Sequence, residues 1–159
     1  MSFLKRLFGQ SEPPEGDNPS CDSTDEEGPF MEHPTGEFPT ARDAIESTLC
    51  RLRSLERWDD WITFSGQGMG ARPDSYYVVD VRMRDDVLDS GVPGIPLGEV
   101  LERSGLLHAG ITTDSLDETA FRLVGADPAQ TAAFLDSLFF QLGVRPFDGE
   151  DDYAVGAEW

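Results

Sequence analysis

A glycine-rich segment, Gly66-Gln-Gly-Met-Gly70, is the first stretch of this 159-residue chain whose residue types suggest chemistry. Glycine loops bind phosphate when their backbone N–H groups converge on the N-terminus of a following helix. Here the glycines lead instead into a turn signature, Arg72-Pro73-Asp74-Ser75, and then into a strand pattern. The segment therefore predicts the connection of a β-hairpin. If this loop forms a contact surface, Met69 and Arg72, at its tip, are the side chains that we expect to touch a partner.

The segment Asp80–Asp89 has the highest density of charged side chains in the second half of the chain. Its aspartates could hold a hard cation, because Mg²⁺ and Ca²⁺ prefer oxygen ligands. Their spacing matches no calcium loop, however, and Arg82 and Arg84 place positive charge beside them. We therefore expect acid–arginine pairs on a solvated strand face and no metal. If the segment binds a partner, Arg82 and Arg84 are the residues that we expect to recognise it.

Nucleophilic catalysis requires a serine or cysteine that is activated by a neighbouring base. The chain has two histidines: His33 lies in an acidic N-terminal segment, and no sequence feature pairs His108 with a nucleophile. Cys50 lies within a helix pattern, where a core position is expected. The sequence predicts no catalytic residue and no cofactor. An enzyme that uses His108 or the Asp80–Asp89 segment is retained as an alternative.

The elements that position these residues begin at Thr40, which can cap a helix. Apolar residues at helical spacing follow it and predict an amphipathic helix that ends near Trp58. Trp61–Ser65 is rich in strand-forming residues, and Tyr76–Arg84 alternates between apolar and polar side chains. Together these two segments predict an antiparallel hairpin. Trp58 and Trp61, at the ends of elements, are expected to close the core.

The remaining part of the chain predicts a short helix, a strand, a longer helix and a final strand. The short helix is expected over Pro96–Gly105 and the strand over Thr119–Gly125. The longer helix is capped by Asp127 and Gln130 and ends at Gly143, and the final strand is Asp152–Trp159. The last three predict a right-handed βαβ crossover with parallel strands. The predicted fold class is α+β: a single domain over 39–159 with a mixed sheet of about four strands. Trp159, on a chain-terminal strand, is expected to contribute to an interface.

Residues 10–38 carry nine carboxylates and no Lys or Arg, and they include five prolines. Such a composition cannot bury a core, so we predict a disordered acidic linker. Residues 1–9 differ, because as a helix they place apolar side chains near one side with two cations beside them. We predict an amphipathic docking peptide made of Phe3, Leu4, Lys5, Arg6, Leu7 and Phe8.

The charge balance excludes one class of partner. The whole chain has a net charge of −19 at pH 7, and residues 39–159 keep 22 acidic residues against ten arginines. A surface this negative repels phosphate backbones, so we expect no nucleic-acid binding. The two cysteines form no disulfide framework by pattern, and a reducing compartment is expected. No apolar run has the length of a membrane span, so a cytoplasmic location is predicted, with peripheral contact at the inner face of the membrane through residues 1–9.

These features favour a non-enzymatic adaptor or accessory protein. Its domain would bind a protein partner, and its N-terminal peptide would recruit it to a membrane surface or a larger assembly. An alternative is an acidic inhibitor or immunity-type protein that neutralises a basic partner, such as a nuclease, through electrostatic steering.

Overall fold

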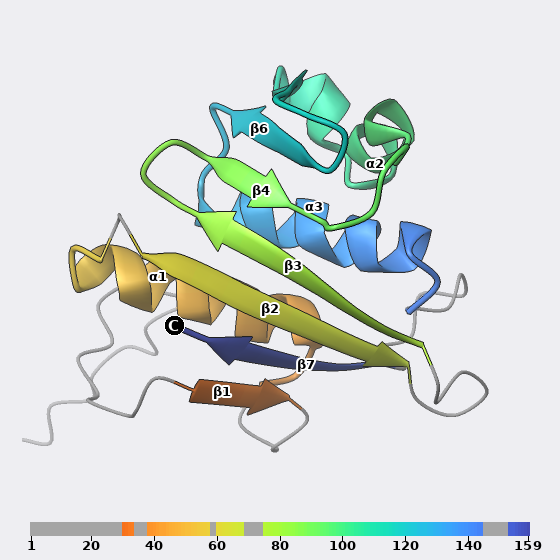
Figure 1. Cartoon of the computed structure of the whole chain (residues 1–159). Coiled ribbons are helices and arrows are strands. Elements are labelled where there is room, and N and C mark those ends of the chain that lie inside the picture. Colours follow the sequence, from red (N-terminus) through yellow and green to blue (C-terminus); the bar gives the residue numbers. More distant parts are fainter. Residues whose placement is uncertain (1–29, 34–37, 58–59, 69–74, 145–152) are drawn as a thin grey trace, which may run out of the picture.

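The computed structural model of the chain describes residues 30–33, 38–57, 60–68, 75–144 and 153–159 (Figure 1). Its elements are β1 (Phe30–His33), α1 (Ala41–Ser54), β2 (Trp61–Gly68), β3 (Tyr76–Arg82), β4 (Val87–Asp89), α2 (Leu97–Arg103), the 3₁₀ helix η1 (Leu106–Ala109), β5 (Thr112–Ser115), β6 (Ala120–Val124), α3 (Pro128–Gln141) and β7 (Tyr153–Glu158). The predicted α+β class is confirmed.

The strands form one sheet in the order β1-β7-β2-β3-β4-β6-β5. Six of these strands lie between Trp61 and Glu158, and β1 pairs with the outer side of β7. Every neighbouring pair is antiparallel. The prediction of a mixed sheet with about four strands is therefore wrong, whereas the predicted β2–β3 hairpin is confirmed.

The unit predicted as a βαβ crossover is formed by β6, α3 and β7, but its two strands are not neighbours. Strands β6 and β7 run in the same direction, but β4, β3 and β2 lie between them in the sheet. The segment that contains α3 therefore crosses over three strands, and β6 and β7 share no ladder. Because β6 and β7 do not pair with each other, two strands of the same direction add no parallel ladder, and the sheet is not mixed.

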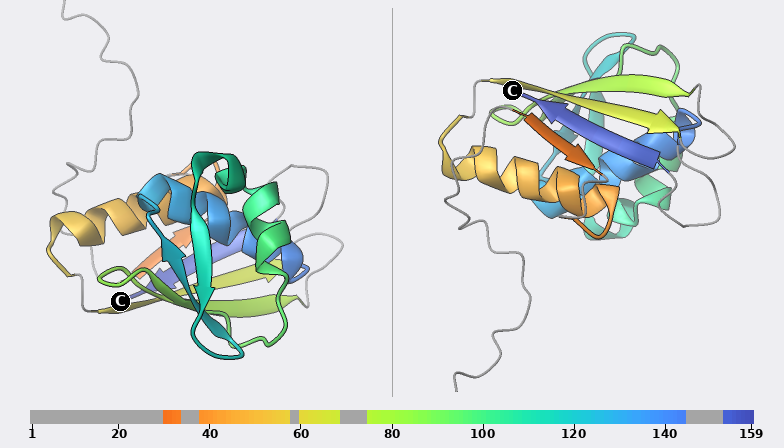
Figure 2. Two further views of the ribbon diagram at one scale, coloured as in Figure 1. Left: turned by 90° about the horizontal axis from the view of Figure 1, so that it is seen from above. Right: turned by 90° about the horizontal axis from the view of Figure 1, so that it is seen from below.

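Helices α1 and α3 pack beside each other on one face of the sheet, as the two views of Figure 2 show. The alternation of the strands turns Ile62, Phe64, Val79 and Val81 toward these helices, where all four side chains are buried. In the part of the chain that the structure describes, no helix covers the opposite face. We call this opposite face the open face.

Local capping signals set the ends of the helices. The Thr40 side chain accepts a hydrogen bond from the Asp43 backbone N–H at 3.1 Å, and α1 begins at Ala41, directly after this cap. Asp127 and Gln130 form a complete capping box at the start of α3. Helix α1 ends at Ser54, earlier than the predicted end near Trp58.

Three short strands escaped the sequence prediction. Strand β4 has three residues and β5 reads Thr-Thr-Asp-Ser, so neither shows a useful alternation of apolar and polar side chains. Strand β1 lies within the range 10–38 that the sequence predicts to be disordered, and its four residues pair with β7. The other residues of that range, and the docking peptide at 1–9, lie outside the described residues.

The buried thiol of α1 also differs from expectation. Cys50 is 8% exposed, as a core position requires. It is disulfide-bonded, however, so the expectation of a reduced cysteine is wrong. A sequence with one cysteine in a helix pattern carries no spacing signal for such a bond.

The first glycine of the 66–70 segment has a packing role in β2. A Cβ atom on Gly66 would lie 2.6 Å from Cδ1 of Phe139, a fully buried ring of α3. The Phe139 ring also packs on Tyr153 of β7, with centroids 5.8 Å apart. The Tyr153 hydroxyl in turn donates a hydrogen bond to Asp136 of α3 at 2.8 Å. The absence of a side chain at Gly66 thus lets α3 approach the sheet.

We expect Gly66→Ala to lower the free energy of unfolding by about 1–3 kcal/mol, because the buried Phe139 ring must move to admit the methyl group. Gly98→Ala in α2 is the matched control, since its Cβ would meet no atom within 4 Å. That change should raise stability by about 0.4–1 kcal/mol. Urea unfolding of both variants measures the difference, and a Gly66→Ala protein as stable as the wild type would contradict this packing role.

Candidate functional site

One row of cross-strand neighbours crosses the open face from β2 to β5. In order across the sheet, its members are Trp61, Arg82, Val87, Arg122 and Asp114. We call these five residues the arginine row. The strand neighbours of the first four members are buried in the core: Ile62, Val81, Leu88, Phe121 and Leu123. The pleat therefore places these four on the side without helices, and Asp114 joins them as the cross-strand neighbour of Arg122. It is the candidate functional site.

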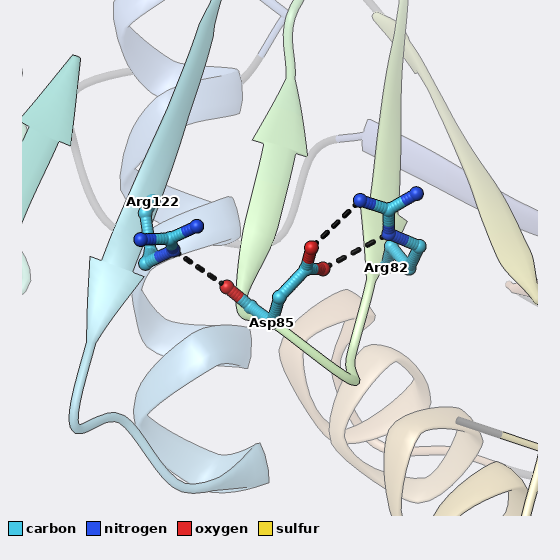
Figure 3. Close-up of polar contacts among 3 residues, drawn as sticks. All are labelled: Arg82, Asp85 and Arg122. Carbon is cyan, nitrogen blue, oxygen red and sulfur yellow. Dashed lines mark hydrogen bonds and ion pairs between the residues drawn. The ribbon is translucent and has the colours of Figure 1, made fainter. Parts of the chain in front are cut away.

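The two arginines of the row hold the β3–β4 turn from both sides (Figure 3). Arg82 donates from Nε to Oδ1 of Asp85 at 2.9 Å and from Nη2 to Oδ2 at 2.7 Å. Arg122, on β6, donates from Nε to the backbone carbonyl of Asp85 at 2.9 Å. A bidentate arginine–carboxylate pair fixes the guanidinium plane as well as its position. Both arginine side chains are thus already ordered before any partner arrives.

The pKa values of two carboxyl groups in this turn are shifted in opposite directions. The hydrogen bonds from Arg82 hold the pKa of Asp85 below its ordinary value, against a smaller effect of burial. For the next residue, Asp86, burial raises the pKa, and the charge of Asp85 adds to the effect. Asp86 also has a φ of 56°, in the left-handed region that aspartate tolerates better than most residues. The turn is therefore built by specific contacts and not by glycine.

Trp61 lies at the β2 end of the arginine row. The Arg82 guanidinium stacks over its ring, with 4.9 Å between Cζ and the ring centroid. The residue is 43% exposed, so the expectation that Trp61 closes the core is wrong. The core positions of β2 belong to Ile62 and Phe64, because alternation places Trp61 on the opposite side. An aromatic ring stacked on an ordered arginine is an exposed, rigid apolar surface.

A second row of the open face is acidic. Asp80 and Asp89 are directly opposite each other on β3 and β4, and Glu158 is opposite Thr63 on the other side. Asp80 accepts a hydrogen bond from the Thr63 hydroxyl at 2.7 Å, and Asp89 accepts one from the Gly91 N–H at 2.9 Å. Among the described residues, no three His, Cys, Asp or Glu side chains form a group that could hold a metal ion.

The structure separates the other residues that the sequence singles out. Arg84 is exposed in the β3–β4 turn, on the same segment as Arg82. Trp159 packs partly against the core, with the Arg51 guanidinium 5.7 Å from its ring centroid, and is not part of the arginine row. His108 is exposed in η1. The remaining predicted site residues lie outside the described part of the chain: Phe3, Leu4, Lys5, Arg6, Leu7, Phe8, Met69 and Arg72.

Two concave regions are small. The first, about 50 Å³, lies between α1, the start of α3 and Asp86. The second, about 150 Å³, lies between the β4–α2 loop and the β5–β6 turn. Pockets for small molecules and cofactors have volumes of about 300–1,000 Å³. Neither region offers such a ligand enough room.

No family model, curated protein or solved structure matches this chain. None of the helices among the described residues combines the length and the apolar character of a membrane span. An α+β fold hosts many unrelated functions. The function must therefore be inferred from the residues of the open face and their contacts.

The sequence analysis missed Arg122 as a site residue. Its signal was present, because in Thr-Ala-Phe-Arg-Leu-Val the arginine stands between Phe121 and Leu123, which are both buried. Strand alternation thus places Arg122 on the solvent face. The pairing of β4 with β6, which brings Arg122 beside the β3–β4 turn, cannot be predicted from any local pattern.

The pKa of Asp85 gives a testable dependence on pH. Because its pKa is lowered in the folded protein, its ionised form contributes stability above the unfolded pKa of about 3.9. This contribution disappears as the pH falls through the lower, folded value. We therefore expect Asp85→Asn to cost about 0.2–1 kcal/mol at pH 7 and progressively less below pH ~4.

Urea unfolding at neutral and acidic pH tests this expectation. Glu118→Gln is the control, because Glu118 is exposed and makes no hydrogen bond or ion pair that the structure shows with a described residue. Its effect should be small at every pH. A loss for Asp85→Asn that stays constant at acidic pH would show that the charge of Asp85 does not stabilise the turn.

Proposed function

We propose that this protein is a non-enzymatic adaptor or accessory protein whose domain binds a protein partner through the open face. The observation that carries the proposal is Trp61, which is 43% exposed and rests on Arg82. Trp and Arg are enriched among the residues that dominate binding energy at protein interfaces. Tyr76, which is 57% exposed, adds a second aromatic ring on the same face, at the other end of the β2–β3 hairpin.

The ordered state of Arg82 supports a binding role. Fixing a long side chain at an interface costs about 0.5–1.5 kcal/mol. For Arg82 the bidentate contact with Asp85 already restricts the side chain in the free protein, which lowers this cost. The stacked Trp61 ring has only two side-chain torsions to restrict. The pair can therefore bind with a smaller loss of entropy than a mobile surface pair.

The N-terminal peptide supplies the second part of the proposal. Met1–Gly9 combines Phe3, Leu4, Leu7 and Phe8 with the cations Lys5 and Arg6, and an acidic segment separates it from the domain. Burial of one such apolar side chain is worth about 1.5–3 kcal/mol when it is complete. The peptide then recruits the domain to a membrane surface or a larger assembly, by weak and reversible contact.

A second candidate is an inhibitor that neutralises a basic protein. The acidic row of the open face, with Asp80, Asp89 and Glu158, favours it, as does the net charge of −19. Such a complex would associate faster at low ionic strength, because complementary charges steer the encounter. A steep dependence of the association rate on salt concentration would distinguish this candidate from an aromatic-anchored adaptor.

The open face is tested by partner capture followed by affinity measurement. The full-length chain is used to isolate a partner from native lysate, and the dissociation constant is then measured with the purified partner. We expect Trp61→Ala to weaken binding about 30-fold, the effect of losing a residue that dominates an interface. Leu55→Ala is the matched control, because Leu55 is 53% exposed at the end of α1, away from the open face.

Leu55→Ala should leave the dissociation constant unchanged. Both variants should have a urea midpoint close to that of the wild type, because each loses only one exposed side chain. If Trp61→Ala bound as tightly as the wild type, the open face would not be the binding surface. A loss confined to Leu55→Ala would place the interface on α1 instead.

Deletion of Met1–Gly9 tests the recruitment peptide separately. We expect the deletion to release the protein from the membrane or high-molecular-mass fraction of a cell lysate, because the apolar side chains that contact that fraction are gone. Purified domain without these nine residues should still bind the captured partner with unchanged affinity. Unchanged partitioning after the deletion would remove the recruitment role.

A further inference from the structure

Strand β5 forms one edge of the sheet, since β6 is its only neighbour among the described strands. An edge strand presents unpaired backbone groups, and proteins usually protect such edges with charges, proline, bulges or a covering element. The sequence of β5, Thr-Thr-Asp-Ser, contains one charge and no proline. With four residues and one aspartate the edge is short, but no described strand covers its outer side, so its outward backbone groups can pair with an extended chain.

The register identifies which backbone groups of β5 point outward. The Leu116 N–H donates to the Ala120 carbonyl of β6 at 2.9 Å, and the Leu123 N–H donates to Asp86, on the β4 side, at 2.9 Å. Bonds in an antiparallel ladder alternate between residues. The backbone groups of Asp114 therefore face β6, where Asp114 is opposite Arg122. The N–H and C=O groups of Thr113 and Ser115 point away from the sheet.

Exposed apolar side chains lie at both ends of this edge. Leu116 directly follows β5 and is 48% exposed. Val124, opposite Thr112 on β6, is 39% exposed, and Leu107 in the preceding η1 is 52% exposed. These are three of the six large hydrophobic side chains that are exposed among the described residues. A strand that paired with β5 would cover part of this apolar surface.

The charge around β5 specifies the chemistry of that strand. From Ser104 to Phe121 the chain has no Lys or Arg, and it carries Asp114, Asp117 and Glu118, all exposed. The nearest cation is Arg122, opposite Asp114 on β6, and its Nε donates to the Asp85 carbonyl. A second copy of this chain fits poorly. In an antiparallel pair of two β5 strands, the outward backbone groups of Thr113 bond to those of Ser115 in the copy. This register sets the two Asp114 side chains directly opposite each other, and like charges in that position are destabilising. A basic strand instead places a cation opposite Asp114.

We propose that β5 is a strand-addition site for an extended basic segment of a partner protein. The partner segment pairs with the backbone of Thr113 and Ser115 and places a Lys or Arg opposite Asp114. Residues of the segment two positions from this cation lie on the same face, and their side-chain stems can cover Leu116. The site rests on the proposed protein-binding function and names the kind of segment that the domain accepts.

A short alternating Lys-Val peptide, labelled with a fluorophore, is the probe. Thr113→Pro removes an outward N–H and no bond to β6, and proline is tolerated at such edge positions. We expect this change in the full-length chain to weaken peptide binding about tenfold, since it removes one pairing group and blocks its neighbour. Thr113→Ala keeps the N–H and should bind within about twofold of the wild type.

Fluorescence anisotropy measures affinity, and amide NMR shifts locate the contact at Thr113 and Ser115. A Lys-Pro peptide of equal charge cannot pair as a strand and should bind at least about tenfold more weakly. Ser115→Pro serves as the second variant if Thr113→Pro does not fold. Equal peptide binding by the folded proline variant, or equal binding of the two peptides, would overturn the proposal. So would a dimer of the wild type that the proline variant loses.

The failure of this site and the failure of the proposed function have different signatures. If the peptide does not bind but the captured partner still requires Trp61, strand addition at β5 is refuted and the open-face function stands. If the peptide binds at Thr113 but Trp61→Ala leaves partner affinity unchanged, the open-face function is refuted and the strand-addition site stands.

Discussion

The structure depends on the burial of a single face of an antiparallel sheet. Helices α1 and α3 supply that cover, and α3 approaches closely because Gly66 leaves room for the Phe139 ring. Aromatic and hydrogen-bonded contacts of Tyr153 then attach β7 to α3. Once these contacts form, strand alternation fixes which side chains face outward. The open face follows from this one-sided cover (Figure 1), and the β5 edge follows from the strand order.

The open face carries a connected series of ordered side chains. Trp61 is held on Arg82, Arg82 on Asp85, and Arg122 holds the same turn from the other side. Ion pairs of this kind add little stability when exposed. Their effect is to order the surface, so that an aromatic ring and a guanidinium keep fixed positions. The proposed protein-binding role rests on this fixed aromatic–arginine surface, since Trp and Arg are enriched at protein interfaces.

The sequence predicted the elements whose signals are local. Caps at Thr40 and Asp127, the alternation of β3 and the glycine stop at Gly105 all correspond to the structure. It missed β1, β4 and β5, which are short and gain their strand character from a neighbour. The strand order escaped for the same reason, because pairing of β4 with β6 depends on contacts between distant segments. Of the candidate site, Arg82 was predicted from the acidic residues beside it. Trp61 was assigned to the core because it stands at the end of an element, whereas the alternation of β2 places it on the open face.

The central claim is that a partner meets the open face and not the helices. Site-specific photo-crosslinking tests it most directly. A photo-reactive phenylalanine analogue is placed either at Tyr76, on the open face, or at Leu55, at the end of α1; the two side chains are 57% and 53% exposed. We expect a covalent adduct with the captured partner from position 76 and none from position 55. An adduct from position 55 alone would contradict it.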